Sequence, residues 1–205
     1  MMRKNQHRGM LIAIDGPNGS GKSTIIKKLK KELEQHKYQV YITREPTDSE
    51  LGAFVREYAE KNTGVALACL VAADRYEHIK NEIIPHLKEG QIVLSDRYVL
   101  SSLILQGMDG VDLEFICEIN RDILCPDLQI AVFADEEILQ KRLLEREMLT
   151  RFEKDNQSER EIEYLKKGIE ILRGYGVKVF CVENNSQLDN NVETLLNEIN
   201  KLWEE

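Results

Sequence analysis

The sequence predicts an α/β fold in which helices flank a five-stranded parallel β-sheet. Short runs rich in β-branched residues alternate along the chain with longer helical patterns, an order typical of a parallel sheet covered on both faces. Three of these runs also lack the alternation of apolar and polar residues that marks a half-exposed strand. The chain has 205 residues, 42% of them hydrophobic, which is enough to form the core of one domain.

The five predicted strands are short and are separated by helical patterns. They cover residues 10–15, 38–43, 91–96, 128–134 and 177–182. The first, third and fourth lack alternation, so we expect these three to be the strands covered on both faces.

The helical patterns fill the intervals between the strands. They cover residues 22–36, 49–61 and 65–88, two stretches within 97–124, a charged pair within 135–175, and an amphipathic stretch over 188–205. No linker rich in Pro, Gly or Ser interrupts this series, so we expect a single domain over residues 1–205.

Charge and composition limit the classes of function. The formal net charge is −8, which argues against a general affinity for nucleic acid or for an anionic membrane. No run is long enough to span a membrane and the first apolar run is too short for a signal peptide, so we expect a cytoplasmic protein. The four cysteines form no CxxC pair, which predicts buried, reduced thiols rather than a metal site: Cys69, Cys117, Cys125 and Cys181.

A phosphate-binding motif follows the first predicted strand. Residues 16–23 read Gly-Pro-Asn-Gly-Ser-Gly-Lys-Ser and fit G-x-x-x-x-G-K-[ST], between a strand and a helix as the motif requires. Its glycines let backbone N–H groups turn inward at a helix N-terminus and surround an anion. The residues expected to bind ATP are Gly16, Asn18, Gly19, Ser20, Gly21, Lys22, Ser23 and Thr24.

Two of the nearby side chains are suited to Mg²⁺. Ser23 is the motif's hydroxyl ligand, and Asp96 ends the third predicted strand at the edge of the sheet where such folds bind ligands. A carboxylate there can hold Mg²⁺ directly or through water. Asp96 could equally cap the N-terminus of the helix that begins at about Arg97, and both roles stay open.

Arginines outside the motif indicate a second anion site. They are Arg44, Arg56, Arg75, Arg97, Arg142, Arg146 and Arg151. Arginine binds phosphate through a planar fork of permanent charge, and bringing two phosphorylated substrates together requires cations around both. Arg75 lies within apolar sequence and Arg97 at a strand end, which sets these two apart from ordinary surface arginines. No N-K-x-D guanine motif follows a strand, which disfavours a GTPase.

Four stretches of the chain resemble the thymidylate kinase family in order and spacing. They are TREPTDSELGAFVR (43–56), residues 70–107, residues 126–147 and RFEKD (151–155). The resemblance implies a P-loop NTPase fold with a small helical lid, ATP and Mg²⁺ as cofactors, and phosphorylation of a nucleoside monophosphate, usually dTMP to dTDP. Family members are usually homodimers packed through the helices around 65–88 and 97–105.

The resemblance also implies roles for individual residues. The acceptor would be bound by Glu45, Pro46, Arg56, Val71, Arg75, Arg97, Ser101, Leu105 and Gln106. Catalytic roles would belong to Lys22, Arg97, Arg142, Arg146 and Asp15. Phosphoryl transfer depends chiefly on in-line placement and distributed positive charge, so no dedicated general base is required, although Asp15 or Glu45 could accept a proton.

Two departures from the family pattern fall in the base pocket. The family usually has Phe at the position of Val71, where it stacks on thymine, and Tyr at the position of Leu105, against the deoxyribose. A base–aromatic stack contributes about 1–3 kcal/mol. Either neighbouring rings such as Tyr98 or Phe54 replace it, or the acceptor differs from dTMP. Two further departures are Thr47-Asp48-Ser49 after the REP stretch and Thr150 before RFE.

The stretch from about 142 to 160 is dense in charges of both signs and poor in apolar residues. We expect it to form a lid that excludes water from the triphosphate, the alternative being a solvated helical hairpin. His78 shares a helix face with Arg75 and could face the acceptor or pack between helices. The competing functions are a kinase of a nucleoside or other hydroxyl compound and a non-catalytic nucleotide-binding module.

Overall fold

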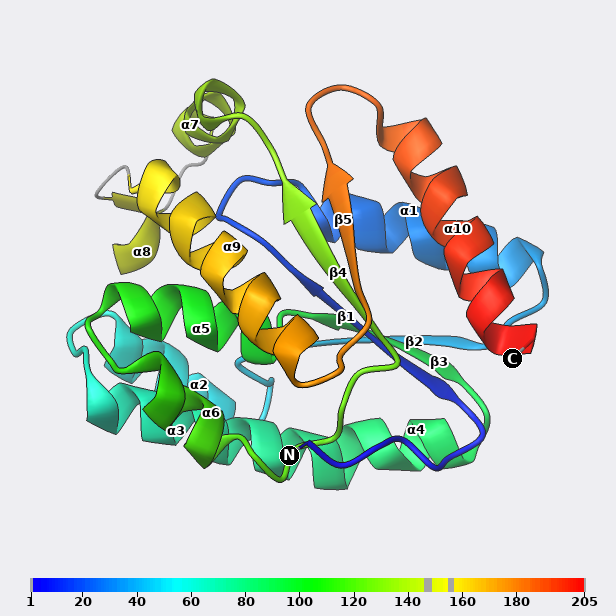
Figure 1. Ribbon diagram of the computed structural model, residues 1–205, viewed down its shortest axis with the longest axis horizontal. Helices are drawn as coiled ribbons and strands as arrows, with labels where there is room; N and C mark the ends of the chain where they lie inside the picture. Colours follow the sequence, from blue (N-terminus) through cyan, green and yellow to red (C-terminus); the bar gives the residue numbers. More distant parts are fainter. Residues whose placement is uncertain (1, 146–148, 155–156, 205) are drawn as a thin grey trace.

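The computed structural model describes residues 2–145, 149–154 and 157–204. Its centre is a sheet of five parallel strands in the order β2-β3-β1-β4-β5. The strands are β1 (Met10–Asp15), β2 (Val40–Arg44), β3 (Ile92–Asp96), β4 (Leu128–Phe133) and β5 (Val179–Glu183). All five point the same way, so the loops that follow them lie along one edge of the sheet (Figure 1).

Helices cover both faces of the sheet (Figure 1). On one face lie α1 (Lys22–Gln35) and α10 (Leu188–Glu204). On the other lie α3 (Val65–His78), α5 (Val99–Met108) and α9 (Ser158–Gly174). Alternate residues of β1 divide between two hydrophobic clusters, because successive side chains of a strand point to opposite faces. β1, β3 and β4 are the buried strands, as their lack of alternation predicted.

The helix predicted over 65–88 is continuous but not uniform. It consists of α3, a π-helical turn η1 (Ile79–Ile83) and α4 (Ile84–Lys88). The π-helical turn precedes Pro85, which has no N–H and would clash with the carbonyl four residues earlier in a regular α-helix.

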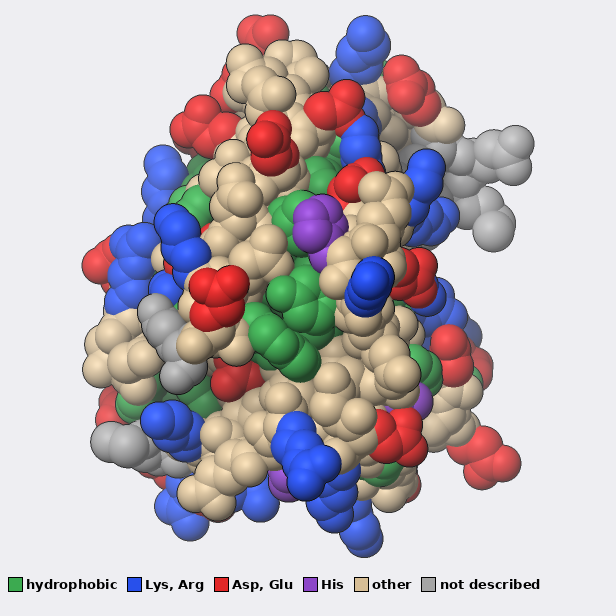
Figure 2. All heavy atoms as spheres, turned by 90° about the vertical axis from the view of Figure 1, so that its right-hand side faces the viewer, with side chains coloured by type: hydrophobic (Ala, Val, Ile, Leu, Met, Phe, Trp, Pro, Cys, Tyr) green, Lys and Arg blue, Asp and Glu red, His purple; other side chains and the backbone are tan. Residues whose placement is uncertain are grey.

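The remaining helices are α2 (Glu50–Ala59), α6 (Leu113–Ile119), α7 (Glu136–Leu144) and α8 (Arg151–Lys154). The predicted pair within 135–175 is therefore three helices in the described part of the chain, α7, α8 and α9. On the face seen in Figure 2, Lys and Arg side chains are interspersed with Asp and Glu around a small hydrophobic patch.

Two findings concern expectations from composition. The prediction of buried cysteines is wrong: Cys69 and Cys181 are exposed and Cys117 and Cys125 half-buried, and all four are free thiols. Among the described residues, none of the helices has both the length and the apolar character needed to cross a membrane.

Candidate functional site

A cavity of about 680 Å³ opens where the loops after β1, β2 and β3 meet. It is lined by the following residues predicted to bind ATP, metal or acceptor: Asn18, Gly19, Gly21, Lys22, Ser23, Thr24, Glu45, Pro46, Arg56, Val71, Arg75, Asp96, Arg97, Ser101, Leu105 and Gln106. Gly16, Ser20, Asp15 and Arg142 are not part of its lining. Arg146 lies outside the described residues. The donor and acceptor residues thus share one cavity.

The phosphate-binding loop needs glycine for two physical reasons. Gly19 and Gly21 have φ of 81° and 88°, in the left-handed region that other residues rarely adopt. A Cβ at Gly21 would also lie 2.3 Å from Nδ2 of Asn184, which donates to the Ser20 carbonyl at 2.8 Å. Helix α1 begins at Lys22, directly after this turn, so its N-terminal N–H groups face the loop.

Lys22 is held inside the loop by carbonyl oxygens. Its Nζ donates to the Gly16 and Pro17 carbonyls at 3.0 and 2.9 Å, and the residue is 6% exposed. Burial, and next the positive charge of Arg97, lower the pKa of Lys22 to about 7. A triphosphate would supply the negative charge that stabilises the ammonium form, so the arrangement fits ATP.

The two predicted metal ligands lie side by side. Ser23 Oγ donates to Asp96 Oδ2 at 2.7 Å, at the mouth of the phosphate loop. One hydroxyl and one carboxylate are the protein share of a Mg²⁺ site that is completed by phosphate oxygens and water, so the donor set fits this ion. Asp96 is not the cap of α5, because that helix starts at a turn capped by Asp15.

Asp15 is a fully buried carboxylate that organises the start of α5. Its Oδ1 accepts the N–H groups of Tyr98 and Ser101 at 2.9 and 3.0 Å and the hydroxyl of Ser101. Its Oδ2 accepts Nε2 of Gln129 at 2.9 Å. Since these bonds occupy both oxygens away from the cavity, the arrangement supports a role in holding Arg97 and Ser101 rather than in contacting substrate.

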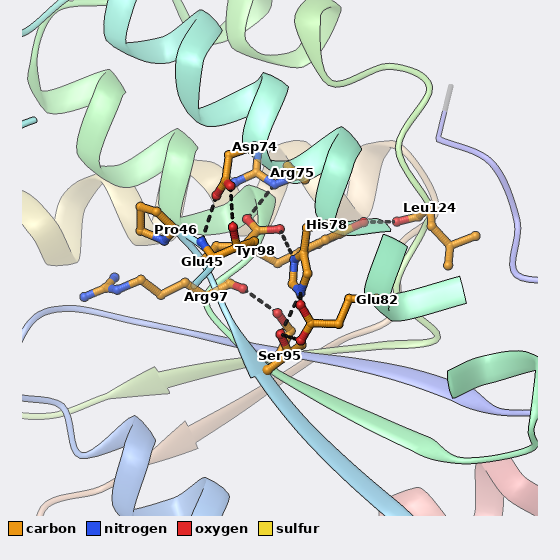
Figure 3. A network of polar contacts seen from close by, with 12 residues as sticks. Glu45, Pro46, Asp74, Arg75, His78, Glu82, Ser95, Arg97, Tyr98 and Leu124 are labelled. Atoms are coloured by element: carbon orange, nitrogen blue, oxygen red, sulfur yellow. Dashed lines mark hydrogen bonds and ion pairs between the residues drawn. The ribbon is translucent and has the colours of Figure 1, made fainter. Parts of the chain in front are cut away.

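Arg97 connects the end of β3 with the phosphate loop. Its φ is +78°, a strained conformation for any residue other than glycine and one that is concentrated at functional sites. Nη2 donates to Asn18 Oδ1 at 2.7 Å and Nη1 to Ser101 Oγ at 3.0 Å. The side chain lines the cavity and extends away from the buried network shown in Figure 3. It therefore lies beside the phosphate-binding loop.

Arg75 lines the cavity but is buried, and most of its hydrogen-bond donors already have protein partners. It is 1% exposed, and all three guanidinium nitrogens donate to protein. Nε donates to Glu45 at 2.8 Å (Figure 3), Nη1 to Asn120 at 2.7 Å and Nη2 to Ser102 at 3.0 Å. Only two of its five N–H groups remain, so the geometry favours Arg97 over Arg75 as the principal phosphate ligand.

The loop after β2 is held by side chains of α2 and α3. Asp74 accepts the N–H and hydroxyl of Thr47 at 2.9 and 2.6 Å, and the Glu45–Pro46 peptide bond is cis. Arg56 Nη1 donates to the carbonyls of Pro46 and Thr47 at 2.8 and 2.5 Å while lining the cavity. These hydrogen bonds hold the loop after β2 in place on the acceptor side of the cavity.

His78 packs between helices and does not line the cavity. Its Nδ1 lies 3.1 Å from Glu45 Oε1 and its Nε2 lies 2.7 Å from Thr43 Oγ1 (Figure 3). Thr43 also donates its hydroxyl hydrogen to Glu82 at 2.5 Å. His78 therefore acts on the site only through Glu45.

The walls of the acceptor end are mainly aliphatic, with Val55, Leu67, Val71 and Leu105. Gln106 is 4% exposed and its Oε1 has no hydrogen-bond partner among the described residues. The residue lines the cavity while this oxygen is itself buried, so a ligand N–H would reach Oε1 only after the amide turns toward the cavity.

The ring that could replace the missing stack is neither of the two expected. Phe54 is 51% exposed and lies outside the cavity lining. Tyr98 touches the cavity but is fully buried, with its hydroxyl on the Leu124 carbonyl at 2.8 Å and its ring 5.4 Å from the Arg75 guanidinium carbon. Phe152 of α8 is the additional aromatic residue of the lining, and the RFE stretch was the signal that could have indicated it.

Helix α8 lies at the acceptor end of the cavity and is held there by hydrogen bonds of Arg151. Arg151 binds both carboxylate oxygens of Asp109 at 2.8 Å and donates from Nε to the Ala59 carbonyl at 2.8 Å. Arg142, also in the predicted lid, instead donates to the carbonyls of Gly19, Ser20 and Asn184 at 3.3, 3.4 and 3.0 Å. Its placement supports a role in bracing the phosphate loop rather than in contacting the transferring group.

A P-loop, a neighbouring serine and aspartate that fit Mg²⁺, and an arginine hydrogen-bonded to that loop in one cavity are the features of a P-loop phosphotransferase. The sequence of this chain matches the thymidylate kinase family model over residues 14–195. The chain therefore belongs to the thymidylate kinase family, whose members use ATP with Mg²⁺ to phosphorylate a nucleoside monophosphate.

Individual relatives agree with this assignment. The chain is 40% identical over 174 residues to a probable thymidylate kinase of Caldivirga maquilingensis, covering 82% of this chain and 84% of that one. It is 38% identical to a probable thymidylate kinase of Pyrococcus horikoshii, over 77% of this chain and 80% of that one. A thymidylate kinase of Caldicellulosiruptor saccharolyticus is 42% identical, over 66% and 70%.

Proposed function

We propose that the protein transfers the γ-phosphoryl group of ATP to dTMP and forms dTDP. The observation that carries this proposal is the hydrogen bond of 2.7 Å between Arg97 Nη2 and Asn18 Oδ1. It sets the guanidinium that would bind the acceptor's phosphate directly against the loop that would bind the donor's phosphates. Two mutually repelling anions can then approach in line between fixed cations.

Different groups of the chain would bind the donor phosphates, the metal and the acceptor's phosphate during transfer. Backbone N–H groups of the loop and Nζ of Lys22 bind the β- and γ-phosphates, and Ser23 and Asp96 hold Mg²⁺, which when bound neutralises charge on those phosphates. Arg97 and Arg56 face the acceptor's phosphate. Helix α8 limits the entry of water, so that ATP is spent on the acceptor rather than on hydrolysis.

Gln106 is the side chain that we expect to hydrogen-bond the base. Its amide oxygen can accept the N3–H of thymine or uracil once it turns toward the cavity. The aliphatic residues Val71 and Leu105 then contact the base and sugar without stacking on them. Selectivity in this pocket would come from hydrogen bonding more than from ring contacts.

An assay of ADP formation with ATP, Mg²⁺ and a panel of dTMP, dUMP, UMP, dCMP and dGMP tests the function. We expect turnover with dTMP well above that with dCMP or dGMP. Turnover with none of them would contradict the proposal. Thermal stabilisation by dTMP but not by thymidine would separate a monophosphate kinase from a nucleoside kinase, because only the former requires the acceptor's phosphate.

We further propose that the protein acts as a homodimer in the cytoplasm. Exposed small residues form a stripe along α3, with Ala66, Cys69 and Ala73 at helical spacing. This supports close helix packing through the 65–88 segment. The 97–105 segment does not offer such a face, because Val99–Gly107 pack inside the monomer apart from the half-buried Leu105. Light scattering of the wild type and of Ala73→Glu tests the assembly; a dimer in both would contradict this interface.

A further inference from the structure

A carboxylate at the start of α9 is bound to the phosphate loop. Glu161 is 3% exposed, and both of its oxygens bind the same residue, 143 positions earlier in the chain. Oε2 accepts the backbone N–H of Asn18 at 2.5 Å, and Oε1 accepts Nδ2 of Asn18 at 2.9 Å. Glu161 does not line the cavity, so its hydrogen-bonded link to the site runs through Asn18, and its charge also raises the pKa of Lys22.

Asn18 transmits this contact to Arg97. A carboxylate can only accept hydrogen bonds, so Glu161 keeps the NH₂ group of Asn18 turned toward itself. The amide oxygen is thereby turned toward Arg97, whose Nη2 donates to it at 2.7 Å. In the opposite orientation of the amide, two donors would face each other and Arg97 would lose this partner.

We propose that Glu161 is a positioning residue, which fixes the orientation of the Asn18 amide and so holds Arg97 ready for the acceptor's phosphate. The inference rests on the proposed function, because it assumes that the acceptor carries a phosphate. It makes the acceptor site depend on the first turn of α9, the helix that begins within the last residues of the predicted lid segment.

The substitution Glu161→Gln tests the inference, since it keeps size but replaces one acceptor by a donor. We expect affinity for dTMP, measured by calorimetry without ATP or metal, to fall about tenfold, the usual effect of losing a charge-assisted hydrogen bond. Affinity for ATP should fall less than affinity for dTMP, since ATP is reached only through the charge of Glu161 on Lys22, whereas general damage to the loop would lower both equally. Glu159→Gln, an exposed residue in the same helical turn, is the matched control and should bind dTMP as the wild type does.

A second substitution should reverse the defect. With Asn18→Asp added to Glu161→Gln, the new carboxylate can accept from the glutamine amide and from Arg97 at once. We expect dTMP affinity within about threefold of wild type, as the restored charge-assisted hydrogen bond implies. A double variant as weak as Glu161→Gln alone would overturn the argument about amide orientation.

Other outcomes also decide. If the dTMP affinity and the turnover of Glu161→Gln are both within twofold of those of Glu159→Gln, the inference is overturned. If Glu161→Gln does not fold, as judged by its melting curve, Asn18→Ala removes the Arg97 partner while leaving Glu161 in place. That variant should lose the same tenfold in dTMP affinity, and unchanged affinity would overturn the inference. A wild type that binds dTMP but does not phosphorylate it contradicts the proposed function instead.

Discussion

The Glu45 carboxylate and the His78 ring meet in the interior of the protein, with Oε1 of Glu45 3.1 Å from Nδ1 of His78. Neither side chain has more than 4% of its surface exposed. The other Glu45 oxygen accepts Nε of Arg75 at 2.8 Å, so a single carboxylate holds two side chains of α3 against the loop after β2. Removing Arg75 or His78 would therefore leave the buried Glu45 carboxylate with one hydrogen-bond donor fewer.

Replacing His78 by leucine should therefore affect stability and acceptor binding together. We expect the free energy of unfolding to fall by about 1–3 kcal/mol, the usual effect of an unpaired buried polar group. KM for dTMP should rise while KM for ATP stays nearly constant, because the network contacts only the acceptor side. Urea denaturation and steady-state kinetics measure both. Glu77→Gln, exposed on the same helix, is the control, and an equal rise in both KM values would contradict the assignment.

Lys22 should make the stability of the metal-free protein depend on pH. Burial lowers its pKa from the ordinary 10.5 to about 7 in the folded chain, so above pH 7 the unfolded chain binds more protons than the folded one. The free energy of unfolding should accordingly rise with pH from about 7 toward 9, with a slope of at most about 1.4 kcal/mol per pH unit. Lys22→Met should lack this rise. A wild-type curve parallel to that of Lys22→Met in EDTA would contradict the lowered pKa.

Gln106→Leu should weaken binding of dTMP more than binding of dCMP. The change removes the unpaired Oε1 without changing the size of the side chain greatly, so only a ligand that donates to it is affected. We expect roughly tenfold weaker dTMP binding, corresponding to about 1.4 kcal/mol for one buried hydrogen bond. Calorimetry with both nucleotides measures the difference. Equal losses for the two would mean that Gln106 shapes the pocket without reading the base.

Asp109→Asn should loosen α8 from the rim of the cavity. Arg151 would then lose the paired contact with two carboxylate oxygens, which joins α8 to the residue that follows α5. Water would reach the donor phosphates more easily, so we expect ATP hydrolysis without acceptor to rise severalfold relative to phosphoryl transfer. ADP release measured with and without dTMP gives this ratio. An unchanged ratio would indicate that α8 does not exclude water.

The parts of the fold that depend on local sequence could be predicted, and those that depend on distant partners could not. The glycines and Lys22 of the phosphate loop are adjacent in the chain, and the buried strands are recognisable from their own composition. Arg75, by contrast, owes its orientation to Asn120, 45 positions away, and Asn18 owes its orientation to Glu161. The residues adjacent in sequence to Arg75 and to Asn18 give no indication of these distant partners.

The same reasoning applies to the two arginines expected at the acceptor's phosphate. Arg75 and Arg97 are both arginines at the borders of apolar sequence, and a family pattern places them together. Only the three-dimensional structure shows that Arg75 uses three of its five N–H groups on protein partners, whereas Arg97 lies beside the P-loop.

The left-handed backbone at Arg97 has a consequence for attempts to improve the protein. Glycine is the residue that this backbone would accept most readily, and it is also the one that brings no guanidinium to the cavity. Selecting variants by melting temperature alone would thus favour Arg97→Gly, which relieves the backbone strain but lacks the guanidinium expected to bind the acceptor nucleotide. At this position a gain in stability would come with a loss of activity.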